Sequence, residues 1–172
     1  MLTKGMVGIL ISVKKYRLKE EGFRKFRVLN YEMCIVCPIC GRVLFVIGTR
    51  RRGIIDSAGE KLTLIIRRLR CKDCLVIHHE LPDTIVPYKR HCAESIEKVI
   101  AGDAAAVYCD STTASRIRVW WAVCYLYFKS VLASLREKHG AVFSDPPALK
   151  EIVRAVVNAH LWVHTRSAVL SG

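Results

Sequence analysis

The residues best suited to chemistry are four cysteines in two closely spaced pairs. Cys37 and Cys40 form one C-x-x-C pair, and Cys71 and Cys74 form the other. Two-residue spacing lets one tight turn direct both sulfurs at the same ion, and two pairs supply the four thiolates of a tetrahedral zinc site. A site closed by four thiolates leaves no position for water or substrate. The pattern therefore predicts a structural zinc ion rather than a catalytic one.

Cys34 leaves the register of the first pair open. Cys34 and Cys37 also make a C-x-x-C pair. Pro38 and Gly41 supply turn chemistry that favours Cys37 with Cys40, which makes Cys34 a buried apolar residue or a substitute ligand.

His78 and His79 follow Cys74 closely enough to take part in the site. Either histidine can replace a cysteine as ligand or donate a hydrogen bond to one, and a strand-ending histidine without such a role is the alternative. Three further cysteines have no partner pattern and are expected to fill the core; they are Cys92, Cys109 and Cys124.

Positive charge is the second informative feature. The chain has a formal net charge of +13, which points to a nucleic acid, an acidic protein or an anionic membrane surface as partner. Residues 42–72 hold nine Lys or Arg against two acids. Six arginines there are expected to face each other across a hairpin and to neutralise phosphates, although a solvated basic face is the alternative. They are Arg50, Arg51, Arg52, Arg67, Arg68 and Arg70.

A second candidate for nucleic-acid contact is the start of a long predicted helix. A short helix, a turn and a following helix over about residues 92–121 are typical of a helix-turn-helix, with Trp120 and Trp121 packed against the first helix. Hydroxyl and arginine side chains at the start of the last helix suit phosphate anchoring and guanine recognition. These residues are Ser111, Thr112, Thr113, Ser115, Arg116 and Arg118. A plain helical bundle with a hydroxyl-rich helix start is the alternative.

The elements that would position the cysteines are strands. Residues 6–13 form an apolar run that predicts a strand, and the charged residues 14–27 are expected to form a loop or a basic arm. Residues 42–55 and 61–70 predict two strands joined by a turn at residues 56–60. A hairpin between two cysteine pairs is the layout of a zinc ribbon, although the 30 residues between Cys40 and Cys71 exceed the roughly 15–20 usual for such pairs.

The second half of the chain predicts helices. They cover residues 92–101, then 104–108 with Asp103 as cap, and then a long helix from Ser111 or Thr112 to about His139. A last helix opens at residues 144–146 and carries an apolar stripe of Leu149, Ile152, Val153, Val156 and Val157. The predicted fold is α+β, with a zinc-ribbon β domain and its basic N-terminal segment at residues 1–87 and an all-α helix-turn-helix domain with a C-terminal helix at residues 88–172.

Several functions are excluded by what the sequence lacks. Its acids fall at predicted caps and turns rather than in a carboxylate cluster, and it has no Gly-rich phosphate loop, so we expect no enzyme. The longest apolar stretch, residues 119–128, is shorter than the roughly 20 residues of a membrane helix, so no membrane partner is expected. No secretory signal precedes the cysteine pairs, which favours metal binding in the cytoplasm over disulfides.

Four segments carry a resemblance to known proteins. They are Cys37-Pro38-Ile39-Cys40-Gly41, residues 69–74, residues 79–82 and residues 86–91. Together they resemble an uncharacterised family of bacterial proteins, mostly from Firmicutes, and the N-terminal zinc-binding and helix-turn-helix segments of insertion-sequence transposases. The resemblance implies a zinc ribbon, a helix-turn-helix and a mobile-element context. It implies no strand transfer, because the large catalytic domain of transposases has no counterpart in this sequence.

The sequence thus predicts a zinc-stabilised DNA-binding protein, a regulator or accessory factor of a mobile element. An interaction module is the alternative, in which the long apolar helix forms a homodimer or binds a protein partner and the zinc ribbon is scaffold. RNA as the ligand and a transposase remnant without function also stay open.

Overall fold

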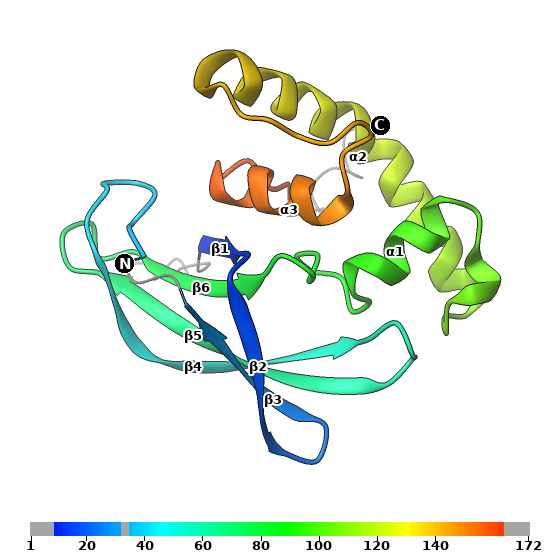
Figure 1. Cartoon of the computed structure of the whole chain (residues 1–172), viewed down its shortest axis with the longest axis horizontal. Coiled ribbons are helices and arrows are strands. Elements are labelled where there is room, and N and C mark those ends of the chain that lie inside the picture. The colour runs from blue at the N-terminus through cyan, green and yellow to red at the C-terminus, as the bar shows by residue number, and fades with distance from the viewer. Residues whose placement is uncertain (1–8, 32–34, 164–172) are drawn as a thin grey trace, which may run out of the picture.

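The apolar runs of the first half form one curled, mixed β-sheet, and the second half forms helices that cover part of it (Figure 1). This computed structural model describes residues 9–31 and 35–163. Cys34 and residues 6–8 of the predicted first strand lie outside the described residues. The strands are β1 (Ile9–Val13), β2 (Tyr16–Gly22), β3 (Lys25–Asn30), β4 (Leu44–Ile55), β5 (Lys61–Cys71) and β6 (Ile77–Pro82). The prediction of an α+β fold is confirmed.

β5 is the central strand of the sheet. The order is β1-β6-β5-β3-β2, and β4 also pairs with β5. β1 pairs with β6 and β3 pairs with β5 in parallel, whereas the hairpins β2–β3 and β4–β5 and the pair β5–β6 are antiparallel. The predicted hairpin between the two cysteine pairs is therefore present as β4–β5, within a larger sheet than a zinc ribbon alone requires.

The charged stretch after β1 forms a hairpin, so the prediction of a loop or basic arm is wrong. β3 packs beside β5 and buries Val28 completely, with Phe26 against the same cluster. β2 lies at the edge of the sheet, and its side chains from Arg17 onward are exposed. A charged edge strand is tolerated because its outer side faces water and resists pairing with other chains. Because β2 is rich in charged residues, it lacks the apolar pattern from which a strand is predicted.

The sheet buries apolar side chains on both faces, because alternate residues of a strand point to opposite sides. One cluster combines Leu69 and Cys71 of β5 with Ile11 and Val13 of β1, and it also contains Cys37. The other cluster contains the alternating β5 residues Leu64 and Ile66, together with Val28, Ile54, Leu81 and Ile85. The cysteine pairs thus lie at one end of the first face.

The helices follow the predicted order, with corrections at their ends. They are α1 (Ala93–Ile100), η1 (Ala104–Ala106), α2 (Ser111–His139) and α3 (Leu149–Asn158). The predicted helix at residues 104–108 is only a single 3-10 turn, and Asp103 makes no side-chain capping bond. Asp110, not Ser111 or Thr112, caps α2 by accepting a hydrogen bond from the Thr113 backbone N–H. α3 begins after the predicted opening at residues 144–146, with Ala148 at its N-cap.

The predicted helix-turn-helix agrees with the structure only in outline. α1 and α2 contact each other, but residues 101–110 separate them, a longer connection than the roughly 3–4 residues usual in that motif. Trp120 is buried in one cluster with Ile96 and Val99 of α1, and its ring lies 6.4 Å from that of Trp162. The helix-turn-helix assignment stays a prediction.

α3 joins the helices to the sheet. Its apolar stripe is buried as predicted, and α3 lies between α2 and β1 (Figure 1). The Asn158 side chain accepts a hydrogen bond from the Ser12 backbone N–H at 2.8 Å and donates one to the Ser12 carbonyl at 3.0 Å. None of the helices in the described ranges is long and apolar enough to cross a membrane.

Candidate metal centre and basic surface

The four predicted cysteines come together at one end of the β4–β5 hairpin. The Sγ atoms of Cys37, Cys40, Cys71 and Cys74 all lie within 4.8 Å of one another. Cys40 and Cys71 approach to 3.3 Å and Cys37 and Cys74 to 3.6 Å, so each close contact joins the two pairs. Sulfurs at about 2.3 Å from a tetrahedral zinc ion lie roughly 3.8 Å apart, close to these spacings.

Both pairs use the same local backbone. The first residue after each pair, Gly41 or Leu75, has a positive φ, +72° and +59° respectively. In the first pair the Gly41 N–H donates to the Cys37 carbonyl at 2.7 Å, which closes a tight turn. This turn is the reason why two residues between cysteines suffice to aim both sulfurs inward. Gly41 fits the conformation without strain, whereas Leu75 does not.

Backbone amides stabilise the thiolate form of Cys71, the first residue of the second pair. The N–H groups of Cys74 and Asp73 lower the pKa of the Cys71 thiol to about 7, against the effect of burial. For Cys74, the Val76 N–H lowers the pKa, but burial and the neighbouring thiols raise it to about 12. Four thiols this close cannot all ionise unless a cation compensates their charge.

The chemistry of the donors fits zinc. Cys37 and Cys71 are completely buried, Cys74 is half-buried and Cys40 is exposed. Four soft sulfur ligands in two turns match a structural zinc site, and the residues present could hold such an ion with no ligand missing. The identity of the metal belongs to the proposal below.

His78 lies beside the group of four sulfurs and is not a member of it. It is completely buried, and its Nε2 lies 3.5 Å from Cys37 Sγ. His79 points to the other face of the sheet, where its Nδ1 lies 3.3 Å from a guanidinium nitrogen of Arg50. Burial lowers the pKa of both histidines. Of the three predicted alternatives, the geometry at His78 favours a hydrogen bond to a cysteine of the candidate site.

The remaining described cysteines lie away from this group. Cys124 is buried in the helical core, Cys109 packs against that core, and Cys92 Sγ lies 3.3 Å from Ser95 Oγ. Core packing, as predicted, accounts for Cys124 and Cys109, and Cys92 packs against a sheet cluster.

The pleat of the sheet divides the six hairpin arginines between its two faces. Arg51 pairs with Ile65 and Arg67 pairs with Thr49, which puts both on the face of the cysteine centre. Arg50 and Arg52 pair with Ile66 and Leu64 on the opposite face. Arg68 and Arg70 lie one and three residues after Arg67 along β5, so both point to that opposite face. The six therefore do not form one surface.

Arg67 is engaged inside the protein. Its Nε and Nη2 donate to the two carboxylate oxygens of Glu80, each at 2.7 Å, and Glu80 has no exposed side-chain surface. The Asn30 side chain donates a further bond to Glu80 at 2.7 Å. This ion pair, which raises the pKa of Arg67 through its bonds to Glu80, leaves Arg67 unsuited to contact phosphate.

Three of the predicted hairpin arginines and Arg90, which the prediction did not include, form a basic cluster. Burial and then the nearby charges of Arg50 and Arg90 lower the pKa of Arg52, whose Nη2 donates to the Lys89 carbonyl at 2.7 Å. Arg50 and Arg68 in turn lower the pKa of His79, after the larger effect of burial. We name this set the arginine cluster: Arg50, Arg52, Arg68 and Arg90. Arg90 lies in the segment of residues 86–91 on which the family resemblance rested, but its position beside the hairpin was not foreseen.

The predicted helix start has a mixed environment. Ser111, Thr112, Ser115 and Arg116 are exposed on the first turns of α2. The Thr113 hydroxyl donates to the Asp110 carboxylate at 2.8 Å, and the Arg118 Nε lies 3.4 Å from the Val99 carbonyl. Thr113 is thus part of the helix cap, whereas the four exposed side chains are accessible to a ligand.

Comparison with known proteins gives one match. Residues 37–120 match the model of a domain of unknown function (DUF6431), a segment that runs from the first metal-site cysteine to Trp120 of α2. Neither the curated proteins nor the solved structures contain a match to the chain. The resemblance to transposase segments is not tested by these comparisons and stays a prediction. Over the stretch that carries the cysteines, the hairpin and the start of α2, this chain is similar to a domain family whose function is unknown.

Proposed function

We propose that the protein is a zinc-stabilised DNA-binding protein in which the metal centre holds the β4–β5 hairpin and its arginine cluster in place. The single observation that carries the proposal is the arginine cluster. Like charges on one surface repel one another, and no carboxylate among the described residues forms an ion pair with any of the four. Backbone phosphates would relieve that repulsion, and the net charge of +13 supports the same partner.

The start of α2 is the second surface in this proposal. Its exposed Ser111, Thr112, Ser115 and Arg116 would anchor phosphates or contact bases. The proposal adds a regulatory or accessory role in a mobile element, for which the transposase resemblance is the support. The proposal includes no catalytic residues, and it places the protein in the cytoplasm.

Fluorescence anisotropy with a short mixed-sequence DNA duplex, titrated with salt, tests the proposal. Arg50→Glu with Arg68→Glu should weaken binding strongly and reduce the slope of log K against log salt by about 2, since two phosphate contacts are lost. The control is Lys19→Glu with Lys138→Glu, two exposed residues outside both surfaces. Arg116→Glu reports separately on α2. Absence of duplex binding by the wild-type protein at low salt would exclude the function.

Metal content tests the zinc part independently. We expect one zinc ion per chain by elemental analysis, with the four site cysteines protected from a thiol reagent and Cys34 reactive. A disulfide between the pairs, or protein that folds without metal, would contradict this part.

A second candidate function is supported by the outer face of α2. Val119, Val123 and Leu126 are 61%, 58% and 73% exposed at helical spacing i, i+4, i+7. Apolar side chains in such a stripe mark a surface for a second copy or a protein partner. Light scattering of the wild type and of Leu126→Glu distinguishes this function from DNA binding. A wild-type dimer that dissociates in the variant, while DNA binding stays intact, supports the interaction module.

A further inference from the structure

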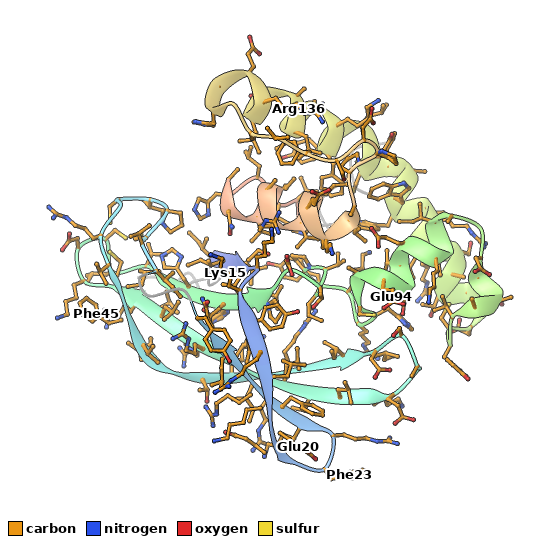
Figure 2. The ribbon with its side chains drawn as sticks, viewed as in Figure 1. Lys15, Glu20, Phe23, Phe45, Glu94 and Arg136 are labelled. Atoms are coloured by element: carbon orange, nitrogen blue, oxygen red, sulfur yellow. The ribbon has the colours of Figure 1, made fainter. Side chains whose placement is uncertain are left out.

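A pocket lies where the bend before β2, the start of β2, the segment after β6 and the first turns of α3 meet. Its volume is 590 Å³, within the range of small-molecule sites. Figure 2 shows Lys15 at this bend, below α3 in the view. The lining residues come from three separate parts of the chain: Lys14, Tyr16, Arg17, Leu18, Asp83, Thr84, Lys150, Glu151 and Arg154. None of them belongs to the metal centre or the arginine cluster.

The charges that converge on this pocket are mainly positive. Four cations line it, Lys14, Arg17, Lys150 and Arg154, against two carboxylates. Both carboxylates have structural partners. Asp83, 7% exposed at its side chain, binds Arg154 at 3.1 Å, and Glu151 accepts a hydrogen bond from the Ala148 N–H at the start of α3. The lining therefore has a net charge of +2, which matches a ligand that carries a charge of −2.

Two hydroxyl groups complete the polar lining. The Tyr16 hydroxyl lies 2.8 Å from Thr84 Oγ1, which joins β2 to the segment after β6. Burial raises the pKa of Tyr16, so its hydroxyl keeps its proton and can donate. Leu18 and the Tyr16 ring add apolar surface beside these groups. Hydroxyl donors, lysines and an arginine with an apolar wall suit a phosphate attached to an organic group.

We propose that this pocket binds the phosphomonoester group of a small phosphorylated ligand, such as a mononucleotide. Lys14 and Lys150 supply the charge for the phosphate, Arg17 adds positive charge from its position 5.3 Å from the Tyr31 ring centre, and Asp83 positions Arg154 at the rim. The volume exceeds that of a phosphate ion and leaves room for the organic part against Leu18. The proposal does not rest on DNA binding, because the pocket and the arginine cluster share no residue.

Isothermal titration calorimetry of the full chain with adenosine 5′-monophosphate tests the proposal. Adenosine and a 5′-phosphorylated single-stranded oligonucleotide serve as the other probes. We expect the monophosphate to bind and adenosine not to bind. Lys14→Ala with Lys150→Ala should weaken monophosphate binding about tenfold or more, because two charge-assisted contacts are lost. The control Lys19→Ala with Lys138→Ala removes the same charge outside the pocket and should leave the affinity unchanged.

The outcomes separate this proposal from others. Equal loss in the two double variants, or adenosine binding as tightly as its monophosphate, would overturn it. Tight binding of the oligonucleotide with no binding of the monophosphate would overturn the small ligand and leave a nucleic-acid end as the source of the phosphate. Duplex binding measured on the same variants distinguishes the two functions, since the pocket variant should keep it. All four substituted lysines are exposed, so the variants should unfold at the wild-type temperature, which a thermal scan verifies.

Discussion

The Nε2 of His78 lies 3.5 Å from the Sγ of Cys37, in a position with no access to solvent. An imidazole protonated at Nε2 donates to a thiolate there and reduces the negative charge of a four-thiolate centre. Its buried Nδ1 has no hydrogen-bond partner within the described part of the chain. Burying this unpartnered nitrogen is unfavourable, and a hydrogen bond from Nε2 to a thiolate of the candidate metal centre would offset that cost.

His78→Ala should weaken metal binding by about 10–100-fold, because hydrogen-bond partners of ligands contribute this much to affinity. Competition with a chromophoric chelator measures the change. His79→Ala is the matched control, since its ring faces Arg50 on the other side of the sheet. His78→Gln, which keeps a donor, should recover part of the affinity. Equal affinities in the two alanine variants would show that His78 only fills space.

Leu75→Gly should stabilise the metal-loaded protein by about 0.5–1 kcal/mol. Leu75 has a φ of +59° and is 53% exposed, so glycine removes backbone strain and loses little burial. Urea unfolding measures the gain. Gly41→Ala, at the equivalent position of the first pair, should cost about 1 kcal/mol from strain alone, because its added Cβ has open space around it. A Leu75→Gly variant less stable than the wild type would contradict the argument.

Glu80→Ala should destabilise the protein by about 3–5 kcal/mol, because it leaves Arg67 partly buried without its carboxylate. The same urea experiment measures this loss. Replacing both residues, as Arg67→Met with Glu80→Leu, should be much less harmful than Glu80→Ala alone, since no unpaired charge remains. A double variant as unstable as the sum of the two single changes would indicate that the pair does not act as a unit.

Acidification should destabilise the fold through His91. This side chain is 8% exposed, and burial lowers its pKa below the ordinary value of 6.5, against the opposing charge of Asp110. As pH falls, the unfolded chain binds a proton at His91 first, so stability present near neutral pH is lost on the way to about pH 5. His91→Gln should flatten this dependence in urea unfolding, whereas a change at the exposed His139 should not. An unchanged slope in His91→Gln would assign the dependence to other groups.

The sequence by itself determined the elements that rest on local spacing. Two residues between cysteines oblige the chain to turn and aim both sulfurs inward, so Cys37, Cys40, Cys71 and Cys74 could be named as one site. The hairpin between the pairs and the apolar stripe of α3 follow from periodicity over neighbouring residues. The α+β class follows from these elements.

Only the tertiary structure decided which residues meet across the chain. β2 and β3 were not predicted, because their sequences are rich in charged residues. β3 is stabilised by its pairing with β5, which is distant in sequence. The pairing register places Arg67 beside buried Glu80 and places Arg50 on the opposite face of the sheet. A one-residue shift in the register would exchange these two faces. Contacts such as His78 with Cys37, and the pocket between β2 and α3, depend on long-range packing that residue spacing does not encode.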